Sequence, residues 1–105
     1  MREKDFKTKL DNWVIKENAY CGSCLLRTGT IHDKQFFKGQ QFIYSRVRSL
    51  LPFKAKKGVV SWIKRRKVEV LDVLKNTCYS TDPYSYGYHE GKDSALDKLS
   101  EVVER

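Results

Sequence analysis

The sequence predicts a mainly α-helical fold of about four helices, and two observations support this prediction. Apolar residues recur at helical spacing along most of the chain, and both prolines stand where a helix would end or begin. A chain of 105 residues has apolar surface for one core, so we expect residues 1–105 to form a single domain. A short β-hairpin near residues 28–42 would change the fold to α+β, which is the alternative fold class.

Residues 3–18 are predicted to form the first helix, because apolar side chains recur there every three or four residues. A turn is expected at residues 20–24, where glycine and serine separate two cysteines. Beyond this turn, residues 28–42 give a mixed signal. Two threonines favour extended backbone and the pair Phe36-Phe37 suits a short strand, so a hairpin is an alternative for this segment.

Two further helices are predicted over residues 40–51 and 58–75. Pro52 ends the first of them, because proline lacks the backbone N–H that a longer helix needs. In the second, Lys67 falls within the apolar arc, so either its stem lies along the core surface or the helix breaks there. A break would allow residues 68–70 to form a strand, and we favour the unbroken helix.

The last predicted helix begins at Pro83 and continues to the C-terminus. Asp82 supplies a helix cap, and proline is favoured at the first helical position. Small residues then occupy every fourth position, at Gly87, Gly91 and Ala95. Each glycine inside a helix costs about 1 kcal/mol relative to alanine, so we expect a close helix–helix contact to retain this small-residue stripe.

Positive charge is concentrated in the middle of the chain. Residues 27–67 contain twelve lysines and arginines and a single acid, Asp33, which gives +11, whereas residues 68–105 give −4. A block of like charge repels itself, and binding to a polyanion is the commonest reason for a protein to carry one. The expected polyanion is nucleic acid, DNA or RNA, bound by a non-enzymatic regulator or accessory factor.

The residues expected to contact phosphates lie in and beside the two middle helices, where each contact would release counterions. They are Arg46, Arg48, Lys54, Lys56, Lys57, Lys64, Arg65, Arg66 and Lys67. Tyr44, Phe53 and Trp62 lie among these charges, and an exposed aromatic ring can stack on an unpaired base. Nothing in the residues chooses between DNA and RNA.

The same basic residues also suit an acidic protein surface or an anionic lipid. The alternative function is therefore an inhibitor or adaptor that binds another protein, such as a nucleic-acid-processing enzyme. Tyrosine is favoured at protein interfaces, and the aromatic anchors would be Tyr79, Tyr84, Tyr86 and Tyr88. The acidic last third could also pair with the basic block, either within the chain or in a homodimer.

Cys21 and Cys24 have the two-residue spacing that lets two thiolates bind one zinc ion. The most economical ligand set adds His32 and Cys78, and the alternative is a pair of buried, unligated thiols. An odd number of cysteines is typical of a reducing compartment. With no apolar run long enough for a membrane span, we expect a cytoplasmic protein without membrane contact, associated with the nucleoid or, in a eukaryote, located in the nucleus.

Catalysis has little support in the residues. The sequence has no serine, histidine and aspartate order with flanking glycines and no glycine-rich phosphate loop. His32 and His89 could each serve as an acid–base group, but a single histidine is more often structural. We expect no enzymatic activity.

Overall fold

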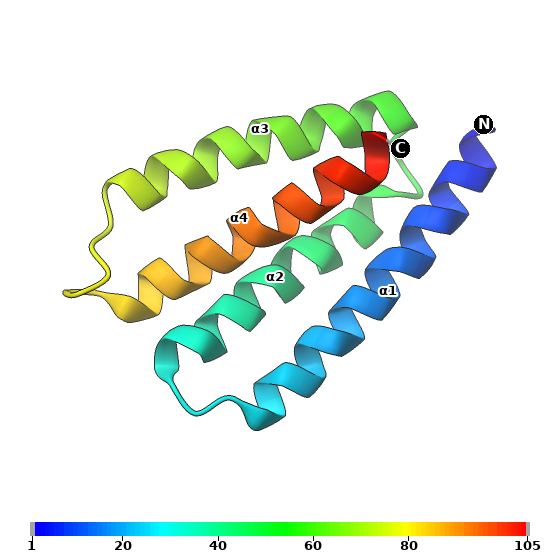
Figure 1. Ribbon diagram of the computed structural model, residues 1–105. Helices are drawn as coiled ribbons and strands as arrows, with labels where there is room; N and C mark the ends of the chain where they lie inside the picture. Colours follow the sequence, from blue (N-terminus) through cyan, green and yellow to red (C-terminus); the bar gives the residue numbers. More distant parts are fainter. Residues whose placement is uncertain (1, 105) are drawn as a thin grey trace.

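The computed structural model describes residues 2–104, which form four α-helices (Figure 1). They are α1 (Glu3–Arg27), α2 (Ile31–Leu50), α3 (Lys56–Lys75) and α4 (Pro83–Glu104). The prediction of a mainly α-helical fold with four helices is confirmed. The hairpin near residues 28–42 and the α+β alternative are wrong, because no strand occurs within residues 2–104.

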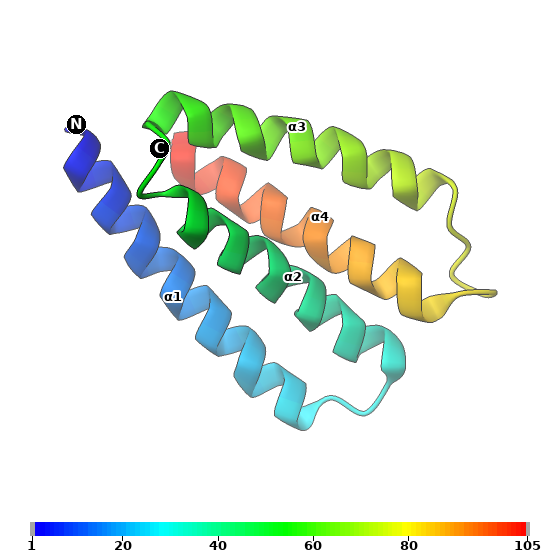
Figure 2. The same cartoon turned by 180° about the vertical axis from the view of Figure 1, so that it is seen from behind.

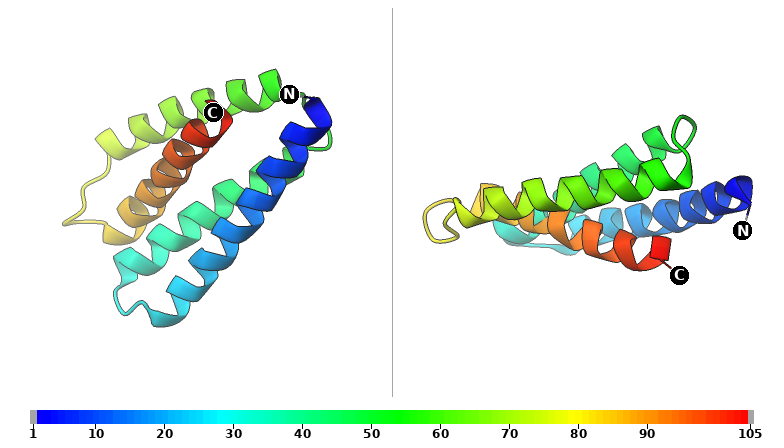
Figure 3. Two further views of the ribbon diagram at one scale, coloured as in Figure 1. Left: turned by 45° about the vertical axis from the view of Figure 1, so that its right-hand side comes forward. Right: turned by 90° about the horizontal axis from the view of Figure 1, so that it is seen from above.

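The helices α2 and α4 form a central parallel pair, with α1 packed on α2 and α3 packed on α4. Seen from behind in Figure 2, the order across the molecule is again α1, α2, α4 and α3. The turned views of Figure 3 show an elongated, shallow bundle, whose Cα extents are 46 × 29 × 21 Å. Because α4 lies between α2 and α3, it contacts both helices, and part of its surface lies at the junction of the three.

The contact between α2 and α4 is too close to admit side chains at three glycines. A Cβ atom added to Gly91 would overlap a backbone carbonyl oxygen of α2, and one added to Gly87 would lie 2.6 Å from another. Gly39 on α2 faces α4 in the same way. Ala95 is fully buried. The prediction that the small-residue stripe marks a close helix–helix contact is confirmed.

The segment predicted as a hairpin is the first half of α2. Thr30 caps this helix, because its hydroxyl accepts a hydrogen bond from the Asp33 amide at 3.2 Å. Gln35 and Gly39 are buried at helical spacing. The tertiary contacts of a helix therefore outweigh the local preference of threonine and phenylalanine for extended backbone.

The turn predicted at residues 20–24 is wrong, because α1 continues without a break to Arg27. Cys21 is buried against α2, where its Sγ atom lies 3.7 Å from Gln40 Oε1. Packing of this kind stabilises a helix more than intrinsic propensity does. It retains Gly22 in helical conformation although glycine disfavours helix.

The last two helices follow the prediction. α3 is unbroken, and the ammonium of Lys67 pairs with the carboxylate of Asp97 on α4, so its stem crosses the helix interface. α4 begins at Pro83, and Asp82 Oδ1 accepts a hydrogen bond at 3.0 Å from a backbone amide one turn into the helix. Both the capping residue and the helix start are therefore as predicted.

One hydrophobic core connects the four helices. Its largest fully buried apolar side chains are Leu10, Ile43, Tyr44, Ile63, Leu96 and Leu99. Fully burying a leucine or isoleucine contributes roughly 1.5–3 kcal/mol, so this core is the main source of stability. Within the described part of the chain, no helix has an apolar stretch that could cross a bilayer.

Candidate nucleic-acid interface

The outer face of α3 presents three exposed cations and a hydroxyl group. Lys57, Lys64 and Arg65 are exposed, and Ser61 lies between them on the same side of the helix. At 1.5 Å rise per residue, these positions extend over about 12 Å of the helix axis. No carboxylate among residues 2–104 lies within ion-pair distance of the three cations. We call these four residues the α3 basic face.

Three other predicted phosphate-binding residues are already paired with carboxylates. Arg48 Nε lies 3.0 Å from Asp11 Oδ1 on α1, and Arg66 Nη1 lies 2.7 Å from Glu69 Oε2. Lys67 is paired with an aspartate of α4. Arg48 therefore faces α1, and the predicted basic surface shared by two helices is divided into separate regions. The ion pair of Lys67 with α4 therefore links the basic segment, residues 27–67, to the acidic segment, residues 68–105, within the chain.

The remaining lysines lie around the start of α3. Lys54 is half-buried in the link before the helix. The backbone amide of Lys56 donates to both carboxylate oxygens of Glu3, at 3.1 and 3.0 Å. Its ammonium lies 5.2 Å from the ring centroid of Phe6. Lys56 is therefore partly engaged in holding α1 to α3.

Of the three aromatic residues proposed for base stacking, one is available. Tyr44 is fully buried and Trp62 is 6% exposed, whereas Phe53 is 86% exposed in the link between α2 and α3. Phe53 precedes Lys54 in the chain, so an apolar ring and a cation are neighbours. A base could stack on this ring alone among the three.

A cleft of about 470 Å³ lies between α2 and α3, with residues of α4 between them. Each helix contributes one cation, Arg46 from α2, Arg66 from α3 and Lys92 from α4, and Glu69 is the single acid in its lining. His89 of α4 also lines it. We call this site the cationic cleft. Lys92 was not singled out from the sequence, and His89 was considered there only as a candidate acid–base group, because both belong to the acidic last third of the chain.

Aromatic rings hold the cations of this cleft in place. The Lys92 ammonium lies 4.5 Å from the ring centroid of Phe42, and the Arg46 guanidinium lies 5.2 Å from the same ring. The Arg66 guanidinium lies 5.6 Å from the centroid of Trp62. A ring attracts a cation through its quadrupole and leaves N–H groups available to other acceptors.

The cleft disfavours further positive charge. Burial lowers the pKa of Lys92, and the neighbouring charges of Arg66 and Arg46 lower it further. Burial and the charge of Lys92 lower the pKa of His89. The His89 Nδ1 atom is buried and has no hydrogen-bond partner among the described residues. The site therefore combines excess positive charge with an unsatisfied polar atom.

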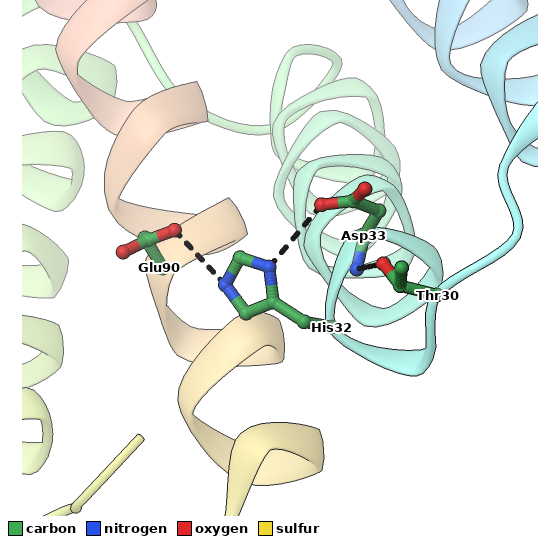
Figure 4. Close-up of polar contacts among 4 residues, drawn as sticks. All are labelled: Thr30, His32, Asp33 and Glu90. Carbon is green, nitrogen blue, oxygen red and sulfur yellow. Dashed lines mark hydrogen bonds and ion pairs between the residues drawn. The ribbon is translucent and has the colours of Figure 1, made fainter. Parts of the chain in front are cut away.

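His32 connects the beginning of α2 to α4. Its Nδ1 atom lies 3.2 Å from Asp33 Oδ1 and its Nε2 atom 3.2 Å from Glu90 Oε1 (Figure 4). The second contact has the distance of an ion pair without the angles of a hydrogen bond. The imidazole also packs against Tyr79 and Tyr86, at centroid distances of 5.1 and 6.4 Å. These contacts fasten the α3–α4 link and α4 to α2.

The four residues predicted to bind zinc do not converge. Cys21 is buried in α1, Cys24 is half-buried, Cys78 is exposed in the α3–α4 link, and His32 points to α4. Burial raises the pKa of Cys21 to about 11, whereas hydrogen bonds, chiefly with Ser80, lower the pKa of Cys78 to about 7. Within residues 2–104, no three His, Cys, Asp or Glu residues form a metal-binding group. The zinc site stays a prediction that this geometry does not support.

Comparisons with protein-family models, with curated protein sequences and with solved structures find no match to this chain. Its function therefore has to be inferred from its own residues. The α3 basic face and the cationic cleft are the two features that bear on this inference.

Proposed function

We propose that this protein binds nucleic acid through the α3 basic face and acts without catalysis, as a regulator or accessory factor in the cytoplasm. The supporting observation is the set of three exposed cations, Lys57, Lys64 and Arg65, none of which pairs with a carboxylate among the described residues. A cation that already forms an ion pair within the fold binds a phosphate less strongly. These three exposed cations form no such ion pair among the described residues.

Phosphate recognition explains both the charge and its arrangement. Lysine and arginine side chains along one side of a helix can contact successive phosphates, and each contact releases counterions. Ser61 adds a neutral donor of the kind that often binds phosphate oxygens. Phe53 supplies a ring for an unpaired base, which favours strands with single-stranded segments.

The test is a fluorescence anisotropy titration of labelled single-stranded and double-stranded DNA and RNA. The variant K57Q/K64Q/R65Q removes the three free cations, and these exposed positions leave the core unchanged. We expect its affinity to fall about tenfold or more for every sequence, because phosphate contacts carry no sequence information.

The matched control is K16Q/K34Q/K38Q, which removes three exposed lysines of α1 and α2 away from the start of α3. It makes the same change in net charge at another place on the molecule. We expect it to bind within about threefold of the unchanged protein, since distant exposed charges are largely screened. An unchanged affinity of the α3 variant would contradict the proposal.

A second candidate function is binding to another protein, as an inhibitor or adaptor. The observation that favours it is a group of exposed apolar side chains at the end of the bundle where α1 ends and α2 and α4 begin. The group includes Leu26, Ile31, Tyr79 and Tyr84, which are 90%, 55%, 54% and 54% exposed. A pull-down after nuclease treatment separates the two functions, because a retained partner protein favours this one and complete loss favours nucleic acid.

A further inference from the structure

The cationic cleft is distinct from the α3 basic face and has a different chemistry. The basic face is open to solvent, whereas the cleft encloses about 470 Å³ between three helices. This volume lies in the range of about 300–1,000 Å³ that is usual for small-molecule sites. A cleft of this size can hold one anionic group and the molecule that carries it. It is too small to bind successive phosphates along a nucleic-acid strand.

The charges that face the cleft leave an excess of two. Arg46, Arg66 and Lys92 supply three positive charges, and Glu69 supplies the one negative charge in the lining. His89 is the remaining titratable group, and the lowered pKa keeps its imidazole neutral at pH 7. A phosphoryl group with two negative charges would balance this excess, whereas a single carboxylate would leave it half neutralised.

The donors of the cleft are prepared for a ligand. Lys92 lies over Phe42 and also 4.7 Å from the ring centroid of Tyr88, so two aromatic rings orient its ammonium. No carboxylate among residues 2–104 is within ion-pair distance of Lys92 or Arg46. Held by rings, these cations retain their N–H groups, and charge-assisted hydrogen bonds to phosphate are among the strongest that proteins form.

An unsatisfied atom points to the same conclusion. The Nδ1 atom of His89 lies buried without a partner among the described residues, although its residue lines the cleft. A buried polar group without a hydrogen bond costs about 1–3 kcal/mol. A phosphate oxygen that accepts a hydrogen bond from the neutral imidazole, with its proton on Nδ1, would satisfy this atom.

We propose that the cationic cleft is a binding site for a single phosphoryl group, held by Arg46 and Lys92, while Arg66, which is paired with Glu69, adds positive charge beside them. Two sources share this chemistry, the terminal phosphate of a nucleic-acid strand and a free phosphate or phosphate monoester. The first source rests on the proposed function of nucleic-acid binding, whereas the site itself does not.

The site is tested with inorganic phosphate. Thermal unfolding is followed in phosphate and in chloride at equal ionic strength and pH, and we expect phosphate to raise the unfolding temperature, because a ligand of the folded state stabilises it. The variant Lys92→Met should weaken phosphate binding about tenfold or more, as the loss of a charged hydrogen bond predicts. Arg46→Gln, at an exposed position of α2, tests the same site independently.

The source is tested with two oligonucleotides that differ only in a 5′-phosphate or 5′-hydroxyl group. A preference for the phosphorylated strand that is lost in Lys92→Met assigns the terminal phosphate. Equal binding of both strands, with stabilisation by inorganic phosphate intact, supports the site and assigns it to free phosphate or a monoester.

The matched control K57Q/K64Q/R65Q distinguishes the phosphoryl site from the α3 basic face. It should lose affinity for nucleic acid and keep its stabilisation by phosphate, because the cleft is unchanged. Absence of phosphate stabilisation in the unchanged protein, or equal stabilisation in Lys92→Met and Arg46→Gln, would overturn the site and leave the α3 basic face untouched.

Discussion

Two faces of α4 differ in almost every physical respect. The face toward α2 carries Gly87, Gly91 and Ala95, and it lies so close to its neighbour that no larger side chain fits at the glycines. The face toward the cleft carries His89 and Lys92, with open volume in front of them. Residues of one helix thus stabilise the fold on one side and leave one unsatisfied polar atom, His89 Nδ1, on the other.

The difference shows that the side of α4 toward α2 stabilises the fold, whereas the side toward the cleft lowers its stability. Glycines without side chains let α2 and α4 approach each other closely. This close packing gives dispersion contacts over a large area. The cleft gathers three cations, and burial near Arg46 and Arg66 disfavours the charged form of Lys92. A feature that destabilises the fold and is open to solvent suits a binding site.

The largest effect is expected at Gly91. In Gly91→Ala the new Cβ would overlap the Phe36 carbonyl oxygen, so α2 and α4 must separate. Overpacking typically costs about 1–3 kcal/mol, and we expect the upper end because the obstacle is backbone. The free energy of unfolding, measured by urea denaturation followed by circular dichroism, should fall by about 2 kcal/mol after the helical gain of alanine.

The control for this change is Gly22→Ala in α1, where the new Cβ would lie 3.6 Å from the Gln41 side chain, an ordinary contact. Alanine favours helix over glycine, so we expect a gain of up to about 1 kcal/mol. If Gly91→Ala were as stable as Gly22→Ala, the close contact would not be what retains the glycine.

Substitution of Lys92, the residue after Gly91, should have the opposite effect on the free energy of unfolding. Lys92→Met replaces a half-buried cation by an apolar side chain of similar length, and it removes repulsion with Arg66 and Arg46. We expect the free energy of unfolding to stay the same or to rise, measured by urea denaturation without phosphate. A loss as large as that of Gly91→Ala would mean that Lys92 is a structural residue and would contradict the comparison.

The smallest effect is a pH dependence from His89. Its pKa is lowered in the folded protein, so on acidification the unfolded chain takes up this proton first, near pH 6.5. The free energy of unfolding therefore falls as the pH drops from about 6.5 through the folded pKa, and the loss is complete below it. Urea denaturation at several pH values should show this fall, and it should be smaller in His89→Gln. Identical pH profiles of the two proteins would exclude burial of His89 as the cause.

Much of the fold could be predicted from sequence because the signals were local. Asp82 and Pro83 determine the start of α4, and the glycine spacing indicates its contact with α2. The errors at residues 20–24 and 28–42 arose where tertiary packing outweighs local preference. Cys21 and Gln35 are buried in long helices whose neighbouring residues favour turns or strands.

The residues of the candidate site could be predicted in part, because the density of charge is also a local signal. Lys57, Lys64 and Arg65 were identified by the density of charge in the sequence, and their exposure follows from helical geometry. The cationic cleft could not be predicted, since it depends on α4 bringing Lys92 between α2 and α3. Lys92 lies in residues 68–105, whose net charge is negative, so charge composition does not identify it as part of a basic site.

The central claim is that free cations on α3 bind phosphates, and the salt dependence of binding tests it most directly. The association constant for a DNA or RNA fragment is measured at two or more salt concentrations, for the unchanged protein and for K57Q/K64Q/R65Q. Each phosphate contact contributes about 0.9 to the slope of log affinity against log salt for duplex DNA. We expect a steep slope that decreases by about 2–3 in the α3 variant and is unchanged in K16Q/K34Q/K38Q. Equal slopes for the unchanged protein and the α3 variant would contradict the claim.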